Sequence, residues 1–238
     1  MPTNLDYVYI AGAGAYTISG VVLAVWLGLV GGTKTYRGAF GFRTMLACFV
    51  MAMTYLALFM DNGVTLRTVD HVEVAWNRYA GYIAASIVVG ANSSAYFLTG
   101  MVDGWAQVAL VVLEAVFLLI AVLSAGKMRY VWYGVSAGLG IFAFIGYYWG
   151  AQLKFLSGGR FRTLIRWIVL GVAMGGIMVT ALLDAPLASV WNTGALIPGI
   201  LFLCFDFGLI VGIGLWDLIA AMPAPGQQEA LAGHSKAY

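Results

Sequence analysis

The chain has 238 residues, of which 62% are hydrophobic and only 9% are charged. A soluble domain carries about a quarter charged residues, so this composition predicts a membrane protein. The net charge of +2 excludes a nucleic-acid-binding protein. The two cysteines, Cys48 and Cys204, lie inside apolar runs, where free thiols rather than a disulfide are expected.

Seven apolar runs alternate with turn and charge signals along the chain, and each is close to the about 20 residues that a membrane-spanning helix needs. The runs are Tyr7–Val30, Gly41–Met60, Val74–Leu98, Trp105–Ala125, Arg129–Leu153, Phe161–Leu183 and Thr193–Ala220. Short loops join them, which predicts an all-α membrane protein, a seven-transmembrane helix bundle with antiparallel neighbours. Residues 1–221 are expected to form this domain, and residues 222–238 a flexible tail.

The distribution of positive charge predicts the orientation, because Lys and Arg accumulate in cytoplasmic loops. Eight of them flank the helix ends on one side and three on the other. The larger group is Lys34, Arg37, Arg43, Lys154, Arg160, Arg162, Arg166 and Lys236, and the smaller is Arg67, Lys127 and Arg129. We therefore expect a multi-pass protein of the plasma membrane with its N-terminus outside and its tail in the cytoplasm.

Three ionisable residues lie at membrane depth, where such groups are costly and indicate function. Arg78 and Asp206 are either a structural ion pair inside the bundle or part of a functional site. Glu114 is expected to be a neutral carboxylic acid hydrogen-bonded to a neighbouring helix rather than a transport group. The histidines, His71 and His234, fall in a loop and in the tail, so no metal or haem site is expected.

Four segments carry a family resemblance. They are Tyr55–Met60 with the turn Gly63–Thr65, Trp76–Tyr82, Arg129–Ser136, and Asp206 followed by Val211–Leu215. These segments resemble, in that order, the tyrosine-bearing helix end, the "ARYADW" block, the "RFVWWAIS" segment and the aspartate with its "VGFGL" stretch in the microbial (type 1) rhodopsins. The resemblance implies the seven-helix fold of that superfamily, in which Arg78 and Asp206 face each other across a retinal pocket.

The departures from the family pattern concern its chemistry. The retinal-binding lysine, four residues after the aspartate, is Ile210 in this chain, and the remaining lysines fall in loops or the tail. The counterion carboxylate is Gly81, and the proton donor of the pumps is Asn92. The resemblance therefore implies a lysine-less opsin-related protein with no covalent chromophore. Loss of the lysine and the counterion together is coherent, because a buried carboxylate without a cationic partner is destabilising.

The resemblance also implies which side chains border the former retinal pocket. They are Tyr55, Tyr79, Tyr82, Ser86, Trp132, Tyr133, Ala173 and Gly176. The space left without retinal is expected to be bordered also by Gly81, Ala84, Ala85, Gly134 and Met174. Because most of these side chains are small, we expect either a void or tighter helix packing, with the space closed or filled by lipid, isoprenoid or water.

Three functions follow from these observations. The first is a non-photochemical regulator or scaffold in the membrane. The second is a photoreceptor-like protein that binds retinal or a carotenoid non-covalently. The third is an ion or small-solute transporter using Glu114 and Asp206, although no aligned chain of carboxylates supports it. No nucleophile and base pair indicates an enzyme. The expected partners are the lipid bilayer and either a second copy, as a dimer or trimer, or a membrane partner protein.

Overall fold

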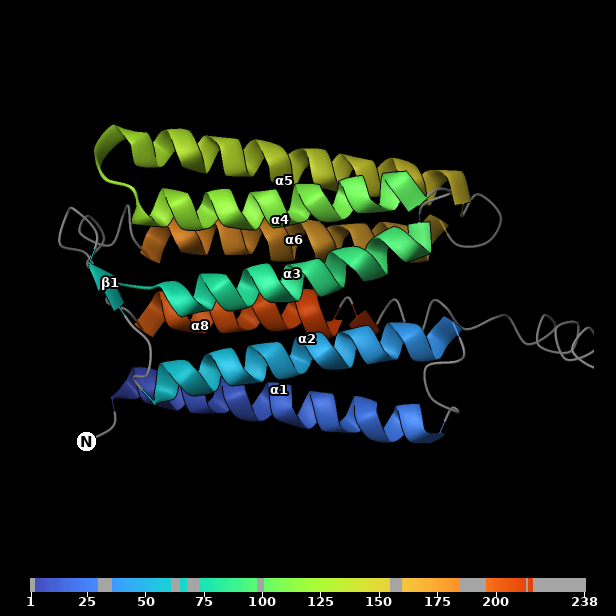
Figure 1. Cartoon of the computed structure of the whole chain (residues 1–238), viewed down its shortest axis with the longest axis horizontal. Helices are drawn as coiled ribbons and strands as arrows, with labels where there is room; N and C mark the ends of the chain where they lie inside the picture. The colour runs from blue at the N-terminus through green and yellow to red at the C-terminus, as the bar shows by residue number, and fades with distance from the viewer. Residues whose placement is uncertain are drawn as a thin grey trace, which may run out of the picture.

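The computed structural model describes residues 3–29, 36–60, 65–67, 73–97, 101–154, 160–184, 196–212 and 214–215. Seven α-helices occupy most of these residues and lie side by side with their long axes roughly aligned (Figure 1). They are α1 (Asn4–Leu29), α2 (Tyr36–Phe59), α3 (Trp76–Phe97), α4 (Met101–Leu123), α5 (Gly126–Lys154), α6 (Arg160–Asp184) and α8 (Leu196–Phe207), which continues as the π-helix η2 (Gly208–Gly212). The predicted seven-helix bundle is confirmed.

The last helix closes the bundle. Successive helices pack together from α1 to α5, and α8 packs against both α1 and α6. The buried residues of α8 are Pro198, Gly199, Phe202 and Asp206. Asp206 therefore lies inside the bundle, as the sequence predicts.

The turn between α4 and α5 differs from its prediction. The α5 helix begins at Gly126, three residues before the predicted start at Arg129. Gly126 has a φ of 57°, in the left-handed region that favours glycine, and it makes the sharp change of direction possible. Arg129 is buried, and its Nε donates a hydrogen bond to the Ser124 carbonyl at 2.9 Å. This basic residue therefore helps to hold the turn.

A short β-hairpin lies between α2 and α3, where the sequence analysis expected no strand. Strands β1 (Thr65–Arg67) and β2 (Glu73–Ala75) pair antiparallel, with Leu66 opposite Val74. Val74 was predicted to begin a helix, but α3 starts at Trp76. The β-branched side chain of Val74 favours a strand, and its apolar character alone could not distinguish the two structures.

The outer surface of the bundle is apolar, as expected for contact with lipid. Exposed apolar side chains include Ile18, Val22, Val25, Phe142 and Val172. Within the described residues, three helical stretches are long and apolar enough to cross a membrane, namely Asn4–Leu29, Gly41–Phe59 and Gly126–Ile145. Shorter apolar stretches are Val108–Leu123, Ile168–Leu182 and Leu196–Gly212. These features support a membrane protein, and the orientation of its termini stays a prediction.

Candidate functional site

A buried polar cluster connects four helices around Asp206. Asp206 is 1% exposed, and its Oδ2 accepts a hydrogen bond from the Tyr55 hydroxyl of α2 at 3.2 Å. Arg78 of α3 is also buried, and its Nη2 donates to the Tyr9 hydroxyl of α1 at 3.0 Å. The positive charge of Arg78 lies near enough to Asp206 for the two to interact electrostatically. The cluster thus brings both predicted charges together, while a direct ion pair between them stays a prediction.

Aromatic rings surround these charges. The Arg78 guanidinium lies 4.6 Å from the ring centroid of Phe202 and 5.7 Å from that of Tyr9, in the geometry of cation–π contacts. Tyr16 stacks on Tyr55 with ring centroids 5.7 Å apart. Within the described part of the chain, the Tyr16 hydroxyl and Asp206 Oδ1 are buried without a hydrogen-bond partner. Such groups are costly in an apolar interior, which marks this cluster as the polar centre of the bundle.

Thr54 occupies the space beside Gly81, the residue predicted to stand at the counterion position. A Cβ atom added at Gly81 would lie only 2.2 Å from Thr54 Oγ1 and 2.9 Å from Thr54 Cβ. Thr54 Oγ1 also donates a hydrogen bond to the Val50 carbonyl at 2.9 Å, which fixes its orientation. The structure therefore leaves no room for a carboxylate on Gly81 unless α2 and α3 move apart.

Phe205 fills the space beside Gly176, one of the residues predicted to border the retinal pocket. A Cβ atom added at Gly176 of α6 would lie 2.3 Å from Cε1 of Phe205, a residue of α8. Ala173, one turn earlier, is buried. Ile210, at the retinal-lysine position, is 1% exposed and belongs to the π-helix η2. Of the two predicted outcomes for these small residues, tighter helix packing is found at Gly81 and Gly176.

The second intramembrane acid lies in a different part of the bundle. Glu114 of α4 is 1% exposed, and its Oε2 accepts a hydrogen bond from the Tyr82 hydroxyl at 3.5 Å. Its backbone carbonyl accepts one from Ser136 Oγ of α5 at 2.8 Å. The predicted contact of Glu114 with a neighbouring helix is thus present.

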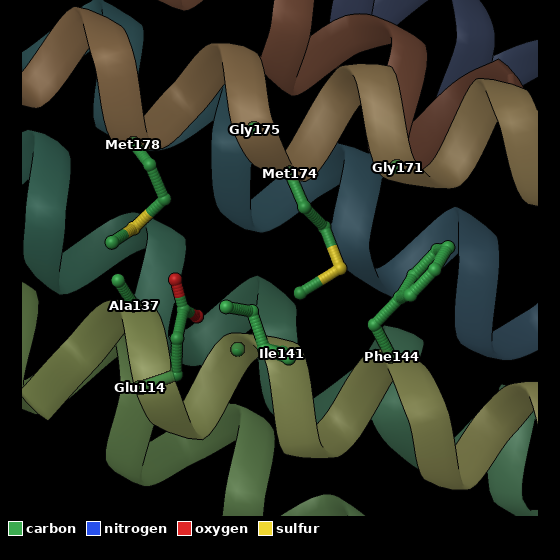
Figure 2. Close-up of a pocket in the computed structure, with 9 residues that line it drawn as sticks. Glu114, Ala137, Ile141, Phe144, Gly171, Met174, Gly175 and Met178 are labelled. Carbon is green, nitrogen blue, oxygen red and sulfur yellow. The ribbon is translucent and has the colours of Figure 1, made fainter.

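The Glu114 side chain borders a cavity of about 340 Å³ between α5 and α6. Figure 2 shows the carboxyl group among Met174 and Met178 of α6 and Ala137 and Ile141 of α5. Among the described residues of the lining, Glu114 alone is ionisable. Met174, one of the residues predicted to border the retinal pocket, lines this cavity. The other predicted border residues whose side chains the structure describes are not part of the lining.

The remaining predicted residues take up separate packing positions. Tyr79 makes an edge-to-face contact with Phe202 at 5.7 Å, and Trp132 stacks on Phe117 at 5.5 Å. The Tyr133 hydroxyl donates to the Met178 carbonyl at 2.5 Å, so it links α5 to α6. The side chains of Ser86 and Asn92 lie outside the described part of the structure.

Sequence reasoning missed the contribution of α1 to the polar cluster. Tyr9 and Tyr16 are seven residues apart, and this spacing places both on one helix face. That signal was present, but the family resemblance covered only the chain from Tyr55 onward. Among the described residues, no three His, Cys, Asp or Glu side chains come together as a metal site requires.

Solved structures of other proteins have a similar fold. The sequence matches no protein-family model and no curated protein. The structure is similar to a cyanorhodopsin from the cyanobacterium Tolypothrix sp., with a TM-score of 0.77 and 19% identity over 93% of this chain and 96% of that one. The chain has the microbial rhodopsin fold. A light-driven proton pump from Coccomyxa subellipsoidea has a similar fold, with a TM-score of 0.75 and 15% identity over 92% of this chain and 97% of that one. Halorhodopsin, a light-driven chloride pump, is also similar, with a TM-score of 0.76 and 13% identity over 91% of this chain and 94% of that one.

The microbial rhodopsin fold explains why the polar cluster lies where it does. Asp206 and Arg78 were predicted from their charge at membrane depth and from the segments that resemble the family, and both are buried in one cluster of this fold. The same superposable architecture covers more than nine-tenths of this chain. At 19% identity, the likeness to the cyanorhodopsin concerns the fold, and the roles assigned to positions Ile210 and Gly81 stay predictions.

Proposed function

We propose that this chain is an opsin-like membrane protein without a Schiff-base lysine, and that it works as a non-photochemical, non-enzymatic regulator or scaffold. The single observation that carries the proposal is Ile210, a buried alkyl side chain where an amine would be needed to bind retinal. An alkyl group cannot condense with an aldehyde. The close approach of Thr54 to Gly81 and of Phe205 to Gly176 supports the same proposal, because a polyene beside these glycines would meet side chains.

The covalent part of the proposal is tested with all-trans retinal. The purified chain is incubated with retinal, reduced with borohydride and weighed as the intact protein by mass spectrometry. We expect no change in mass and no visible absorption band. A lysine-bearing opsin treated in parallel is the positive control, and Ile210→Lys shows whether an amine at this position is sufficient for binding. A mass increase of one retinyl group on the unsubstituted chain would contradict the proposal.

The scaffold part of the proposal concerns partners. Exposed apolar side chains on α1, such as Ile18 and Val22, fit contact with lipid or with another membrane protein. We expect the chain, extracted from its native membrane in polymer-bounded lipid discs, to be part of an assembly larger than one copy. Mass photometry measures this directly. Single copies alone would contradict a scaffold.

The second candidate function is non-covalent binding of retinal or a carotenoid. The cavity between α5 and α6 favours it, since its volume is within the range of small-molecule sites. An absorption spectrum of the chain extracted with native lipid tests this function. A visible band that Gly175→Leu removes would support it, and a colourless preparation would contradict it.

A further inference from the structure

The cavity between α5 and α6 is open to the surroundings of the bundle and has an apolar lining. Ile141 and Gly175, which line it, are also exposed on the outer surface. Met174 and Met178 form part of its wall, and methionine side chains adapt to the shape of a ligand. An apolar molecule dissolved in the bilayer could therefore enter sideways and replace lipid contacts with protein contacts.

Glu114 supplies polarity within this lining. Gly140 makes room for it, because a Cβ there would lie 3.3 Å from Glu114 Cγ. Among the described residues, the carboxyl group has one hydrogen bond, from Tyr82, at the long distance of 3.5 Å. A carboxyl group has about four hydrogen-bonding sites, so most of its capacity is left for a ligand. A buried polar group with so few partners is costly, and a polar ligand atom would relieve that cost.

The chemistry of the cavity selects the type of polar atom. A cationic head would have to lose its water with Glu114 alone to replace it, and a carboxylate head would face a second acid. A ketone or aldehyde oxygen only accepts hydrogen bonds, so it pairs with Glu114 only when the carboxyl group is protonated. A hydroxyl group both donates and accepts, so it pairs with Glu114 in either form.

We propose that this cavity binds a lipid-soluble alcohol, with its hydroxyl group hydrogen-bonded to Glu114 and its hydrocarbon body between α5 and α6. At the packing density of protein interiors, 340 Å³ holds a body of about 15 non-hydrogen atoms. The inference rests on the cavity of the second candidate function and deepens it by naming the class of ligand, and it does not depend on Ile210. A colourless preparation that binds farnesol would contradict the second candidate function and leave this inference in place.

The test compares farnesol with farnesene, a hydrocarbon with the same carbon skeleton and no hydroxyl group. Binding to the full chain in lipid nanodiscs is measured by native mass spectrometry and by the shift in thermal unfolding temperature. We expect farnesol to bind one per chain and about tenfold more tightly than farnesene, because only the alcohol makes the hydrogen bond. Equal binding of the two, or no binding of farnesol, would overturn the proposal.

Variants locate the site. Glu114→Leu should remove the preference for the alcohol while leaving hydrocarbon binding in place. Gly175→Leu should block both ligands, because its added side chain enters the cavity and its Cβ meets no atom within 4 Å. The matched control is Gly138→Leu, whose Cβ is equally free but lies outside the lining, and binding should be unchanged. Farnesol binding that survives Gly175→Leu would overturn the proposal even if Glu114→Leu fails to fold.

Discussion

The tight contact between Thr54 and Gly81 predicts that a side chain added at position 81 lowers the stability of the bundle. In Gly81→Ala, the new Cβ would lie 2.2 Å from Thr54 Oγ1, which is 1.2 Å short of an ordinary 3.4 Å contact. Rotating Thr54 would break its hydrogen bond to Val50 and would still leave Thr54 Cβ at 2.9 Å. Overpacking of this kind costs about 1–3 kcal/mol. Replacing glycine by alanine in a helix gains up to about 1 kcal/mol, so a control with the same gain is needed.

Gly138→Ala is that control, because a Cβ there meets no atom within 4 Å. We expect Gly81→Ala to be about 1–3 kcal/mol less stable than Gly138→Ala, measured as the free energy of unfolding in mixed micelles titrated with SDS. Thr54→Gly combined with Gly81→Ala should recover part of the loss, since it removes the three atoms of Thr54 nearest to the new Cβ, namely Oγ1, Cγ2 and Cβ. Equal stability of Gly81→Ala and Gly138→Ala, or losses of Thr54→Gly and Gly81→Ala that simply add, would refute the closed counterion position.

Three further predictions concern the rest of the closed region and the polar cluster. Ile210→Lys alone should give no visible band with retinal, because side chains fill the space a polyene needs, and a band would show that the region opens. Asp206→Asn should lower the free energy of unfolding by about 3–5 kcal/mol. The double variant Arg78→Gln/Asp206→Asn should recover part of that loss. If the losses of the two single variants simply add in the double variant, the two charges do not interact. Gly176→Ala should destabilise the bundle by about 1–3 kcal/mol and be rescued by Phe205→Ala in the same unfolding assay, and a neutral Gly176→Ala would contradict the packing of Phe205 on α6.

The helix bundle was predictable because the apolar runs carry most of the information. Their length and their separation by glycine and charge determine how many helices form and roughly where each one lies. The predicted helix ends were less accurate, because an apolar run marks only the part of a helix that lies inside the bilayer. A helix can continue into polar residues at the membrane surface, as α2 does at Tyr36 and Arg37. The hairpin containing Val74 was missed because three-residue strands leave almost no periodic signal.

The site was predictable where charge or local motif carried the signal. Arg78 and Asp206 were found because ionisable residues are rare at membrane depth. Thr54 and Phe205 were not found, because their role depends on which side chain of one helix meets which glycine of another. That register is a property of the packed structure, and the small residues at Gly81 and Gly176 are equally compatible with a void and with a tight contact.

The π-helix η2 has a consequence for the length of the last helix. A π turn holds one residue more than an α turn, so Gly208–Gly212 contains a residue that a regular helix would lack. Removing one residue within it would convert the segment to α-helix, with Asp206 still beside Tyr55 and Gly214 still against Thr44. The same deletion before Asp206, for example at Leu201, would instead turn the preceding part of the helix by about 100° relative to the aspartate. We therefore expect the last helix to tolerate the loss of one residue within Gly208–Gly212 better than the loss of one residue before Asp206.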